Sequence, residues 1–228
     1  MMLLSHKSAK CTILLWLCLI LVTGCVSYKL ENKKIKLNEV KDLAYFEPLS
    51  YVNLIHDDNT VSANDSLSLI AKLMLDTVIT QYQNFEVSHK IEVLDLNIQK
   101  KITKELNYLV EKIMHYQQIS NIKLTPTIDS VLKNRKQRFA LATVVTGMGI
   151  EEKNRKQPAK RIDDAKLTLD NYAPIAQKPL STLFAIIIDA ERSEVIFYDH
   201  TTPVQKSPTE KSVLKNQYRK LFKGYYHK

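Results

Sequence analysis

Cysteine is scarce in this sequence, with three among 228 residues, at positions 11, 18 and 25. Cys11 and Cys18 lie in an N-terminal segment with the features of a signal peptide, so a processed chain would keep only Cys25. One cysteine can form no disulfide within the chain, and stability must therefore come from an ordinary hydrophobic core. A metal site on Cys11 and Cys18 is a poor alternative, because Cys18 lies inside an apolar run.

Glycine is rare as well, and two of the four glycines, Gly147 and Gly149, follow an apolar run. Such a pair after a strand is half of a dinucleotide-binding fingerprint, but the third glycine is missing and Glu151-Glu152 follows. Acidic side chains would repel a pyrophosphate from this turn, so the sequence predicts no bound nucleotide. We expect the pair instead to let the chain leave a sheet in backbone conformations that other residues avoid.

Sequence patterns for catalysis and metal binding are also lacking. The chain contains no Gly-x-Ser-x-Gly, and a Ser/His/Asp triad drawn from distant positions stays open without any serine being singled out. The two His-acid clusters, His56-Asp57-Asp58 and Asp199-His200, fall at predicted strand ends, where such residues usually bond to their own backbone. A zinc site shared by these clusters is the alternative. The prediction is a non-enzymatic protein with no metal and no cofactor.

The N-terminal segment, in contrast, carries a full set of export signals. Lys7 and Lys10 precede an unbroken apolar run over residues 13–22, which has signal-peptide length and is short for a membrane span. The run ends in Val22-Thr23-Gly24-Cys25, which resembles the lipobox of bacterial lipoproteins. The resemblance implies cleavage between the glycine and the cysteine and acylation of Cys25. Two or three acyl chains would hold the protein on a membrane almost permanently.

The residues after Cys25 predict a location. Val26 stands where an Asp would favour retention in the inner membrane, so resemblance to the best-known sorting rule implies the outer membrane. Lysines, at positions 29, 33, 34 and 36, replace the acidic cluster that often marks surface export in the Bacteroidota. We therefore expect a lipid-anchored protein of the outer membrane that faces the periplasm, a location that excludes nucleic acid as a partner.

Three regions follow: a signal peptide at 1–24, a flexible polar tether at 25–40 and one folded domain at 41–228. The processed chain has 204 residues (228 minus 24), enough for a domain with a substantial core. Its net charge is +7, which is +9 minus the two signal-peptide lysines. Anionic partners such as lipid headgroups and acidic proteins suit a basic envelope protein, although solubility alone also explains the charge.

Periodicity in the domain predicts an α/β or α+β fold, with a mixed sheet of about five strands and three to four helices packed on it. The predicted strands are 42–48, 51–55, a short one within 85–96, 139–145, and a hairpin of 183–188 and 194–198. The predicted helices are 64–82, 98–116, a short piece near Pro126, and a C-terminal helix introduced by the capping-box pattern Ser207-Pro208-Thr209-Glu210. One face of the first helix is expected to consist of Leu67, Ile70, Met74, Val78 and Tyr82. Residues 151–180, which are charged, are expected to form a surface excursion.

The C-terminal segment combines basic and aromatic side chains. The residues that form a candidate surface for a partner are Lys215, Tyr218, Arg219, Phe222, Tyr225 and Tyr226. Basic residues with aromatic neighbours suit a membrane surface or an acidic partner. The alternative is an ordinary helix packed on the sheet, because any such helix shows an apolar stripe.

The order of elements resembles that of small α/β envelope lipoproteins related to the amino-terminal domain of TolB and the curli-secretion lipoprotein. The matching features are a first strand at Leu43–Pro48, a loop and helix start at Asn64–Ser68, the strand Arg138-Phe139-Ala140-Leu141 and the C-terminal hairpin. The chain also resembles uncharacterised lipoproteins of the Bacteroidota. It departs from this pattern in the long helix at 98–119 and in the excursion at 151–180, and no strand pair is long enough for a pore. The resemblance implies no catalytic residues.

These observations together predict a lipid-anchored, non-enzymatic interaction or assembly module of the cell envelope. Its partner is expected to be another envelope protein or, in a homo-oligomer, a second copy of the chain. One alternative is a protein that binds a small ligand or a lipid in a pocket lined by Phe139, Ile187 or Tyr198. The other is an envelope hydrolase, which would need a histidine and an acid to converge in a cleft.

The lipobox interpretation makes a direct prediction. A Cys25→Ala variant should receive no acyl chain and should accumulate as unprocessed precursor, because the acylated thiol is missing. Metabolic labelling with a fatty acid, together with the mass of the purified chain, measures both effects. A Cys18→Ala variant serves as the control and should be labelled normally, whereas normal labelling of Cys25→Ala would contradict the interpretation.

Overall fold

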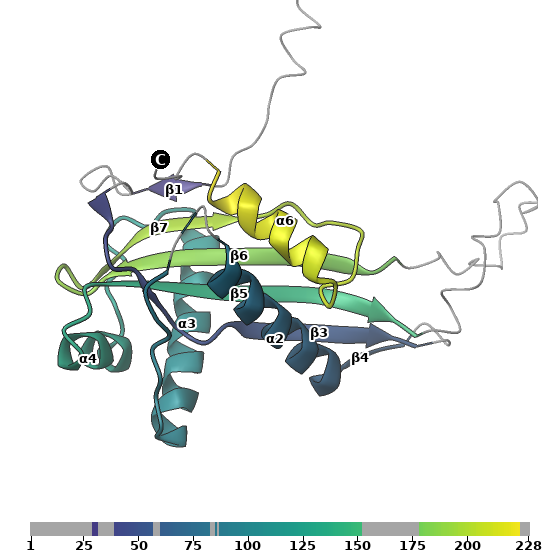
Figure 1. Ribbon diagram of the computed structural model, residues 1–228, viewed down its shortest axis with the longest axis horizontal. Helices are drawn as coiled ribbons and strands as arrows, with labels where there is room; N and C mark the ends of the chain where they lie inside the picture. The colour runs from purple at the N-terminus through teal and green to yellow at the C-terminus, as the bar shows by residue number, and fades with distance from the viewer. Residues whose placement is uncertain are drawn as a thin grey trace, which may run out of the picture.

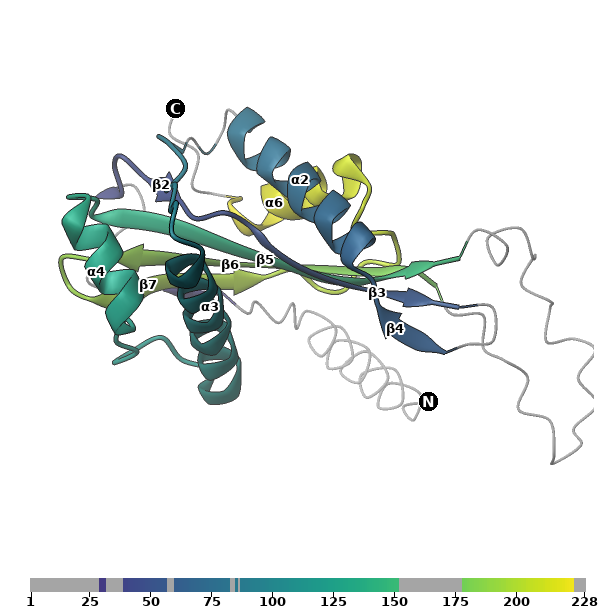
Figure 2. The ribbon, with the colours of Figure 1, turned by 90° about the horizontal axis from the view of Figure 1, so that it is seen from below.

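The computed structural model describes residues 29–31, 39–56, 60–82, 85, 87–151 and 178–223. These residues form a seven-stranded mixed sheet with α2 and α6 on one face and α3 and α4 on the other (Figure 1, Figure 2). The strands are β1 (Leu30–Glu31), β2 (Ala44–Tyr45), β3 (Leu49–Ile55), β4 (Val61–Ala63), β5 (Phe139–Ile150), β6 (Leu180–Asp189) and β7 (Glu194–His200). The helices are α2 (Asp65–Gln81), α3 (Leu96–Tyr116), α4 (Pro126–Asn134) and α6 (Lys211–Leu221). The predicted sites at Gly24, Cys25, Tyr225 and Tyr226, and residues 152–177 of the expected excursion, lie outside the described residues.

Strands β5 and β6 form the centre of the sheet. They pair antiparallel over ten residue pairs, from Phe139 opposite Asp189 to Met148 opposite Leu180. Strand β7 completes the predicted hairpin, and β2 and β3 both run parallel to β5, with β1 and β4 at the two edges. The predicted α/β class with a mixed sheet and a C-terminal hairpin is confirmed.

Alternation along the central strands divides the core into two halves. In β5, Leu141 and Val145 belong to the cluster that includes α2 and α6, whereas Ala142 and Val144 belong to the cluster that includes α3 and α4. Strand β6 is buried along almost its whole length, so both of its faces need a helical cover. Burial of each large aliphatic side chain contributes about 1.5–3 kcal/mol, which makes these two clusters the main source of stability.

Helix α2 begins where the sequence predicts, and it buries the predicted face except at Ile70. The side chain of Asn64 caps the helix, because its Oδ1 accepts a hydrogen bond from the amide of Leu67 at 2.9 Å. The buried residues are Ala71, Leu75, Val78 and Ile79, and the exposed ones include Leu69 (54%), Ile70 (41%) and Leu73 (55%). The predicted face is therefore wrong at Ile70. The helix is apolar on nearly all sides, so apolar spacing alone did not select the side that meets the sheet.

The folded domain begins earlier than residue 41. Leu30 and Glu31, which the sequence assigns to the tether, pair antiparallel with Tyr198 and Phe197 of β7. Val40 is buried in the core cluster of α2 and α6. The prediction of a flexible tether is wrong for these residues, because the free edge of β7 offers backbone hydrogen bonds that polar composition does not reveal.

The short strand expected within 85–96 is not formed. The segment runs beside β2 and exchanges backbone hydrogen bonds with it, from Ser88 to Leu43 at 2.7 Å and from Ile91 to Tyr45 at 2.8 Å. Its sheet pairing is limited to a single bridge between Tyr45 and Lys90. Strand β2 is only two residues long, so its partner cannot extend into a regular strand.

The C-terminal helix starts later than its capping-box pattern predicts. Helix α6 begins at Lys211, and its N-cap residue, Glu210, makes no side-chain capping hydrogen bond. Ser207 is buried, and its hydroxyl accepts a hydrogen bond from the amide of Thr209 at 3.3 Å. The capping-box prediction is wrong because these residues form a turn that packs ahead of the helix.

The two glycines of β5 are needed for space and not for an unusual backbone. Both lie within the strand, which contradicts the expectation that they let the chain leave the sheet. A Cβ on Gly147 would come within 2.3 Å of the Leu180 carbonyl oxygen and 2.8 Å of the Pro208 ring, and a Cβ on Gly149 would come within 2.8 Å of Leu67. The absence of a side chain therefore leaves room for strand β6, for the turn that contains Pro208 and for the first turn of α2.

The inward and outward faces of α2 can be tested separately. Leu75→Ala removes a fully buried side chain and should lower the free energy of unfolding by about 2–5 kcal/mol. Leu73→Ala, the matched control on the same helix, should change it by less than about 0.5 kcal/mol, because Leu73 is exposed. Urea denaturation of both variants gives the comparison. Equal losses would contradict the described orientation of α2.

Candidate functional site

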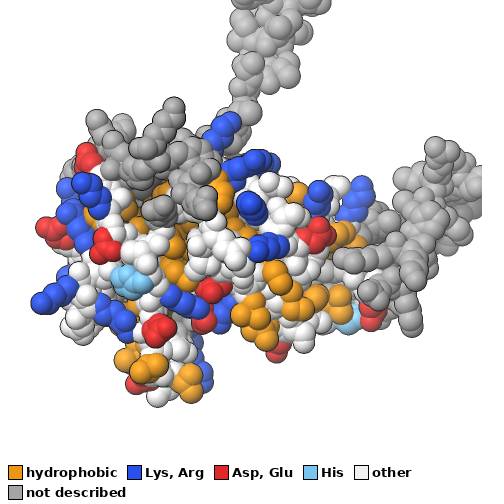
Figure 3. Space-filling view, viewed as in Figure 1, with side chains coloured by type: hydrophobic (Ala, Val, Ile, Leu, Met, Phe, Trp, Pro, Cys, Tyr) orange, Lys and Arg blue, Asp and Glu red, His pale blue; other side chains and the backbone are white. Residues whose placement is uncertain are grey.

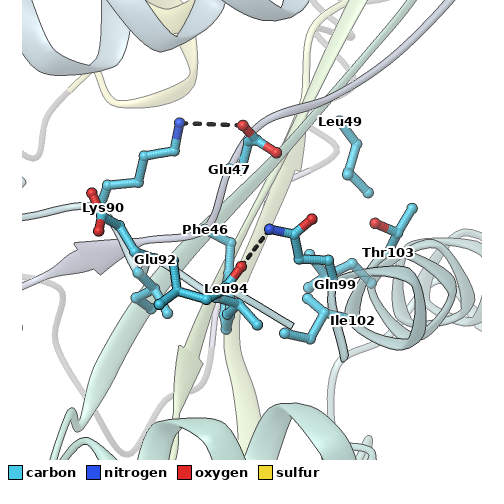
Figure 4. A pocket seen from close by; sticks show the side chains of 12 residues that line it. Phe46, Glu47, Leu49, Lys90, Glu92, Leu94, Gln99, Ile102 and Thr103 are labelled. Carbon is cyan, nitrogen blue, oxygen red and sulfur yellow. Dashed lines mark hydrogen bonds and ion pairs between the residues drawn. The ribbon is translucent and has the colours of Figure 1, made fainter. Parts of the chain in front are cut away.

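A groove lies beside α3, and its apolar floor belongs to the face of the sheet opposite to α2 and α6. Helix α3 projects beyond the sheet, and the segment at 90–95 runs next to its first turns (Figure 1, Figure 2). The groove between them has a volume of about 400 Å³. Its lining residues are Phe46, Glu47, Leu49, Lys90, Ile91, Glu92, Val93, Leu94, Gln99, Ile102, Thr103 and Leu106 (Figure 4).

The floor of the groove is apolar and continuous with the core. Phe46, Ile102 and Leu106 are buried in the cluster that α3 and α4 share with the sheet. Leu49 and Val93 are partly buried and pack against the same cluster. A ligand in the groove would therefore contact apolar side chains that are packed into the core, which suits an apolar side chain or an apolar chain segment.

Charged residues form one rim of the groove. Glu47 pairs with Lys90 at 3.4 Å and with Lys72 at 2.7 Å, and Lys90 pairs with Asp76 at 3.2 Å. Partial burial raises the pKa of Glu47, but hydrogen bonds and charges from Lys72 and Lys90 outweigh it, so the pKa falls below its ordinary value. The two acidic and two basic side chains cancel in net charge. The positions of the separate charges can still favour one orientation of a bound partner.

The segment at 90–95 is held from both ends, so the groove exists before anything binds. The side chain of Asp95 caps α3 and accepts hydrogen bonds from the amides of Asn97 at 2.7 Å and Ile98 at 3.2 Å. Gln99 donates to the carbonyl oxygen of Val93 (Figure 4), and the Arg135 guanidinium donates to that of Glu92. A pre-organised site loses less conformational entropy on binding.

Two leucines at the beginning of α3 face solvent. Leu94, on the groove wall, is 91% exposed, and Leu96, the first residue of α3, is 69% exposed. Their neighbourhood also carries Lys100, Lys101 and Lys104, which are all exposed. Leu94 and Leu96 therefore give the margin of the groove an apolar surface that faces solvent.

The described residues bear on the sequence expectations for metal-ligand clusters and membrane-spanning helices. No group of three or more His, Cys, Asp or Glu side chains converges within the described ranges. The groove lining contains no serine, cysteine or histidine. No helix in the part of the chain that the structure describes is long and apolar enough to cross a membrane.

The surface predicted on the C-terminal helix is only partly present. Lys215 and Arg219 are exposed, as expected for a contact surface. Tyr218 and Phe222 are instead fully buried, and Phe222 stacks on Phe85 with ring centroids 4.0 Å apart. Both aromatic assignments are wrong, because α6 uses these rings to attach itself to α2 and the sheet.

The pocket expected around Phe139, Ile187 and Tyr198 is also not where the groove lies. Phe139 and Ile187 are buried in the α2 and α6 cluster, and Tyr198 is buried in the α3 and α4 cluster. None of the three lines the groove. The apolar residues 91, 93 and 94 beside the groove indicated a short strand within 85–96, and no sequence signal indicated a groove there.

A second feature lies at the β1 edge, and β1 follows Cys25 by five residues in the sequence. Lys29 and Glu31 form an ion pair at 2.6 Å beside Asp199 of β7. Burial raises the pKa of Asp199 from 3.8 to about 6, against the opposing hydrogen bond from the His200 amide and the charge of Lys29. The nearby charge of Glu31 raises it further. At neutral pH this edge therefore holds a carboxylate that burial disfavours.

Asp199 should make the folded domain more stable in mild acid. Its pKa is about 6 in the folded state and about 3.8 in a solvated chain, so the folded state binds the proton more tightly. The destabilisation caused by the ionised, buried Asp199 carboxylate is absent at pH values below both pKa values, and it reaches its full size above pH 6. Asp199→Asn should therefore raise stability at pH 7.5 and change it little at pH 4. Chemical denaturation at the two pH values checks this, and an equal change at both would contradict it.

Comparisons with known proteins find only distant similarity of structure. No protein-family model matches the chain, and no curated protein matches it. Among solved structures, the PelC dodecamer from Paraburkholderia phytofirmans matches with a TM-score of 0.40 and 8% identity, covering 88% of this chain and 96% of that one. The LpoB C-terminal domain from Salmonella enterica matches with a TM-score of 0.28 and 9% identity, covering 72% of this chain and 83% of that one. The chain is thus distantly similar in structure to these two proteins.

Proposed function

We propose that this protein is a lipid-anchored, non-enzymatic interaction module of the bacterial cell envelope. In this proposal Cys25 carries the acyl chains, the protein sits on the periplasmic face of the outer membrane, and the α3 groove binds another envelope protein. The lipobox-like residues 22–25 support the anchor. The order of elements, which resembles that of TolB-related envelope lipoproteins, supports the location.

The observation that carries the binding role is the exposure of Leu94 and Leu96 beside a preformed groove. A leucine that passes from full exposure to burial contributes about 1.5–3 kcal/mol, so the two could supply a large share of the affinity for a partner. The paired charges of Glu47 and Lys90 at the rim would then orient that partner.

The anchor would keep the domain close to its membrane. Leu30 of β1 lies five residues after Cys25 (30 minus 25), and a chain of that length spans at most about 18 Å. The acyl chains would therefore hold the β1 edge near the lipid surface. The groove lies on the α3 face of the sheet and remains open to a partner.

A second candidate function is the binding of a small apolar ligand or a single acyl chain in the same groove. Its volume of about 400 Å³ and its apolar floor favour this alternative. Native mass spectrometry of the purified protein distinguishes the two, because a ligand adds a small discrete mass, whereas a protein partner does not survive purification as such an adduct.

Photo-crosslinking in cells tests the proposed function. A photoreactive residue at position 94 or 96 should give a discrete crosslink to an envelope protein. The same residue at Asn134, which is exposed on α4, is the control and should not. Crosslinks of equal strength at all three positions, or none at 94 and 96, would contradict the proposal.

The matching loss-of-binding experiment places the photoreactive residue at Thr103 in the groove wall. Combining it with Leu94→Asp and Leu96→Asp should abolish the crosslink, because both apolar contacts are removed. Each substitution is at an exposed position, so the melting temperature should hardly change. Persistence of the crosslink in this variant would show that the leucines do not form the contact.

A further inference from the structure

The outer face of α2 is unusually apolar for a helix at the surface. Leu69, Ile70 and Leu73 point away from the core, whose contacts are made by Leu75 and its neighbours. The hydroxyl of Thr77 donates to the carbonyl oxygen of Leu73 at 2.9 Å. That of Thr80 donates to the carbonyl oxygen of Asp76 at 3.0 Å, so these hydroxyls are used within the helix. A helix that is apolar on both its inner and its outer face is normally covered on both.

The outer face of α6, in contrast, is strongly basic. Its exposed cations are Lys211, Lys215, Arg219, Lys220 and Lys223. Glu210 is the one acidic residue between positions 210 and 223, so this stretch has a net charge of +4 (five minus one). The packing of Tyr218 and Phe222 into the core turns the basic side chains outward.

The apolar and basic surfaces belong to one layer. Tyr82 at the end of α2 packs edge-on against Tyr218 of α6 with ring centroids 5.3 Å apart. Lys211 donates to the side-chain oxygen of Gln81 at 2.8 Å. Figure 3 shows both in a single view of the molecule, with hydrophobic side chains gathered over α2 and Lys and Arg side chains over α6. We refer to the exposed residues of these two helices as the α2–α6 face.

We propose that the α2–α6 face rests on the anionic lipid surface of the membrane that holds Cys25. The exposed leucines and Ile70 enter the boundary between headgroups and acyl chains, and the α6 cations contact lipid phosphates. This combination of an apolar patch with flanking lysines is the pattern of interfacial helices. The proposal rests on the lipid anchor of the proposed function, and it adds a second, non-covalent contact and a fixed orientation of the domain.

Three observations favour lipid as the occupant. The charge of α6 is complementary to an anionic surface over the whole length of the helix. The chain between Cys25 and Leu30 spans at most about 18 Å, so the anchored domain cannot move far from the lipid surface. The apolar floor of the α3 groove belongs to the core cluster on the other side of the sheet, so a domain resting on the α2–α6 face would turn α3 toward the periplasm (Figure 2).

Tryptophan fluorescence provides a test, because Trp16 in the signal segment is the one tryptophan of the chain. A Trp16→Phe background removes it whether or not the signal segment is cleaved. In this background the full chain carrying Leu69→Trp is reconstituted into vesicles of phosphatidylcholine and phosphatidylglycerol, with or without brominated acyl chains. The tryptophan at position 69 should shift its emission to the blue and lose most of its intensity in brominated vesicles.

Two controls make the result specific. Leu94→Trp, in the α3 groove, should show neither the shift nor the quenching. Reversing the charges at Lys215, Arg219 and Lys220 to glutamate should remove most of the quenching at position 69. The same reversal at Lys100, Lys101 and Lys104 of α3 changes the net charge equally and should leave the quenching intact.

Several outcomes would overturn the proposal. Quenching of Leu94→Trp in place of Leu69→Trp would mean that the α3 face meets the membrane. A blue shift that depends on protein concentration but not on lipid would mean that a second copy of the chain covers α2. If quenching at position 69 were as strong in pure phosphatidylcholine as in vesicles that contain phosphatidylglycerol, the α6 cations would not bind the anionic lipid. Failure of the anchor itself is detected separately, because the mass of the chain then shows no acyl groups on Cys25.

Discussion

The antiparallel pairing of β5 with β6 is the interaction on which the remaining structure depends. The two strands match over ten residue pairs, and almost every side chain of β6 is buried. A strand that is apolar on both faces must be covered on both faces, so a helical layer is required on each side of the sheet. The two core clusters, and the assignment of each helix to one of them, follow from this requirement.

The two helical layers pack on the sheet in different ways. One layer leaves the exposed α2–α6 face, and the other forms the groove beside α3. On one side, α6 buries Tyr218 and Phe222 and turns its cations outward, while α2 buries one apolar face and leaves another exposed. On the other side, α3 extends beyond the sheet, and the segment at 90–95 encloses a groove against it. In the proposed arrangement, the α2–α6 face rests on the membrane while the groove beside α3 binds a partner.

Some features of the fold were predictable because their signals are local. The cap at Asn64 depends on a side chain and an amide three residues away, and the β6–β7 hairpin depends on two apolar runs around a short turn. The start of α6 was mispredicted for the opposite reason. The residues from Ser207 to Glu210 form a turn that packs ahead of the helix, and the capping pattern contains no information about that tertiary contact.

The sequence by itself determined the order of the main helices and strands and the lipobox-like pattern at residues 22–25, because each depends on neighbouring residues. Only the tertiary structure decided which side of α2 faces solvent, that Tyr218 and Phe222 belong to the core, and that residues near Leu30 join the sheet. The physical reason is that a side chain is buried only where a second surface covers it, and that second surface comes from a distant part of the chain. An apolar side chain on α2 or α6 has the same local pattern whether its partner surface is the sheet or lies outside the molecule, and the sheet covers only one side of each helix.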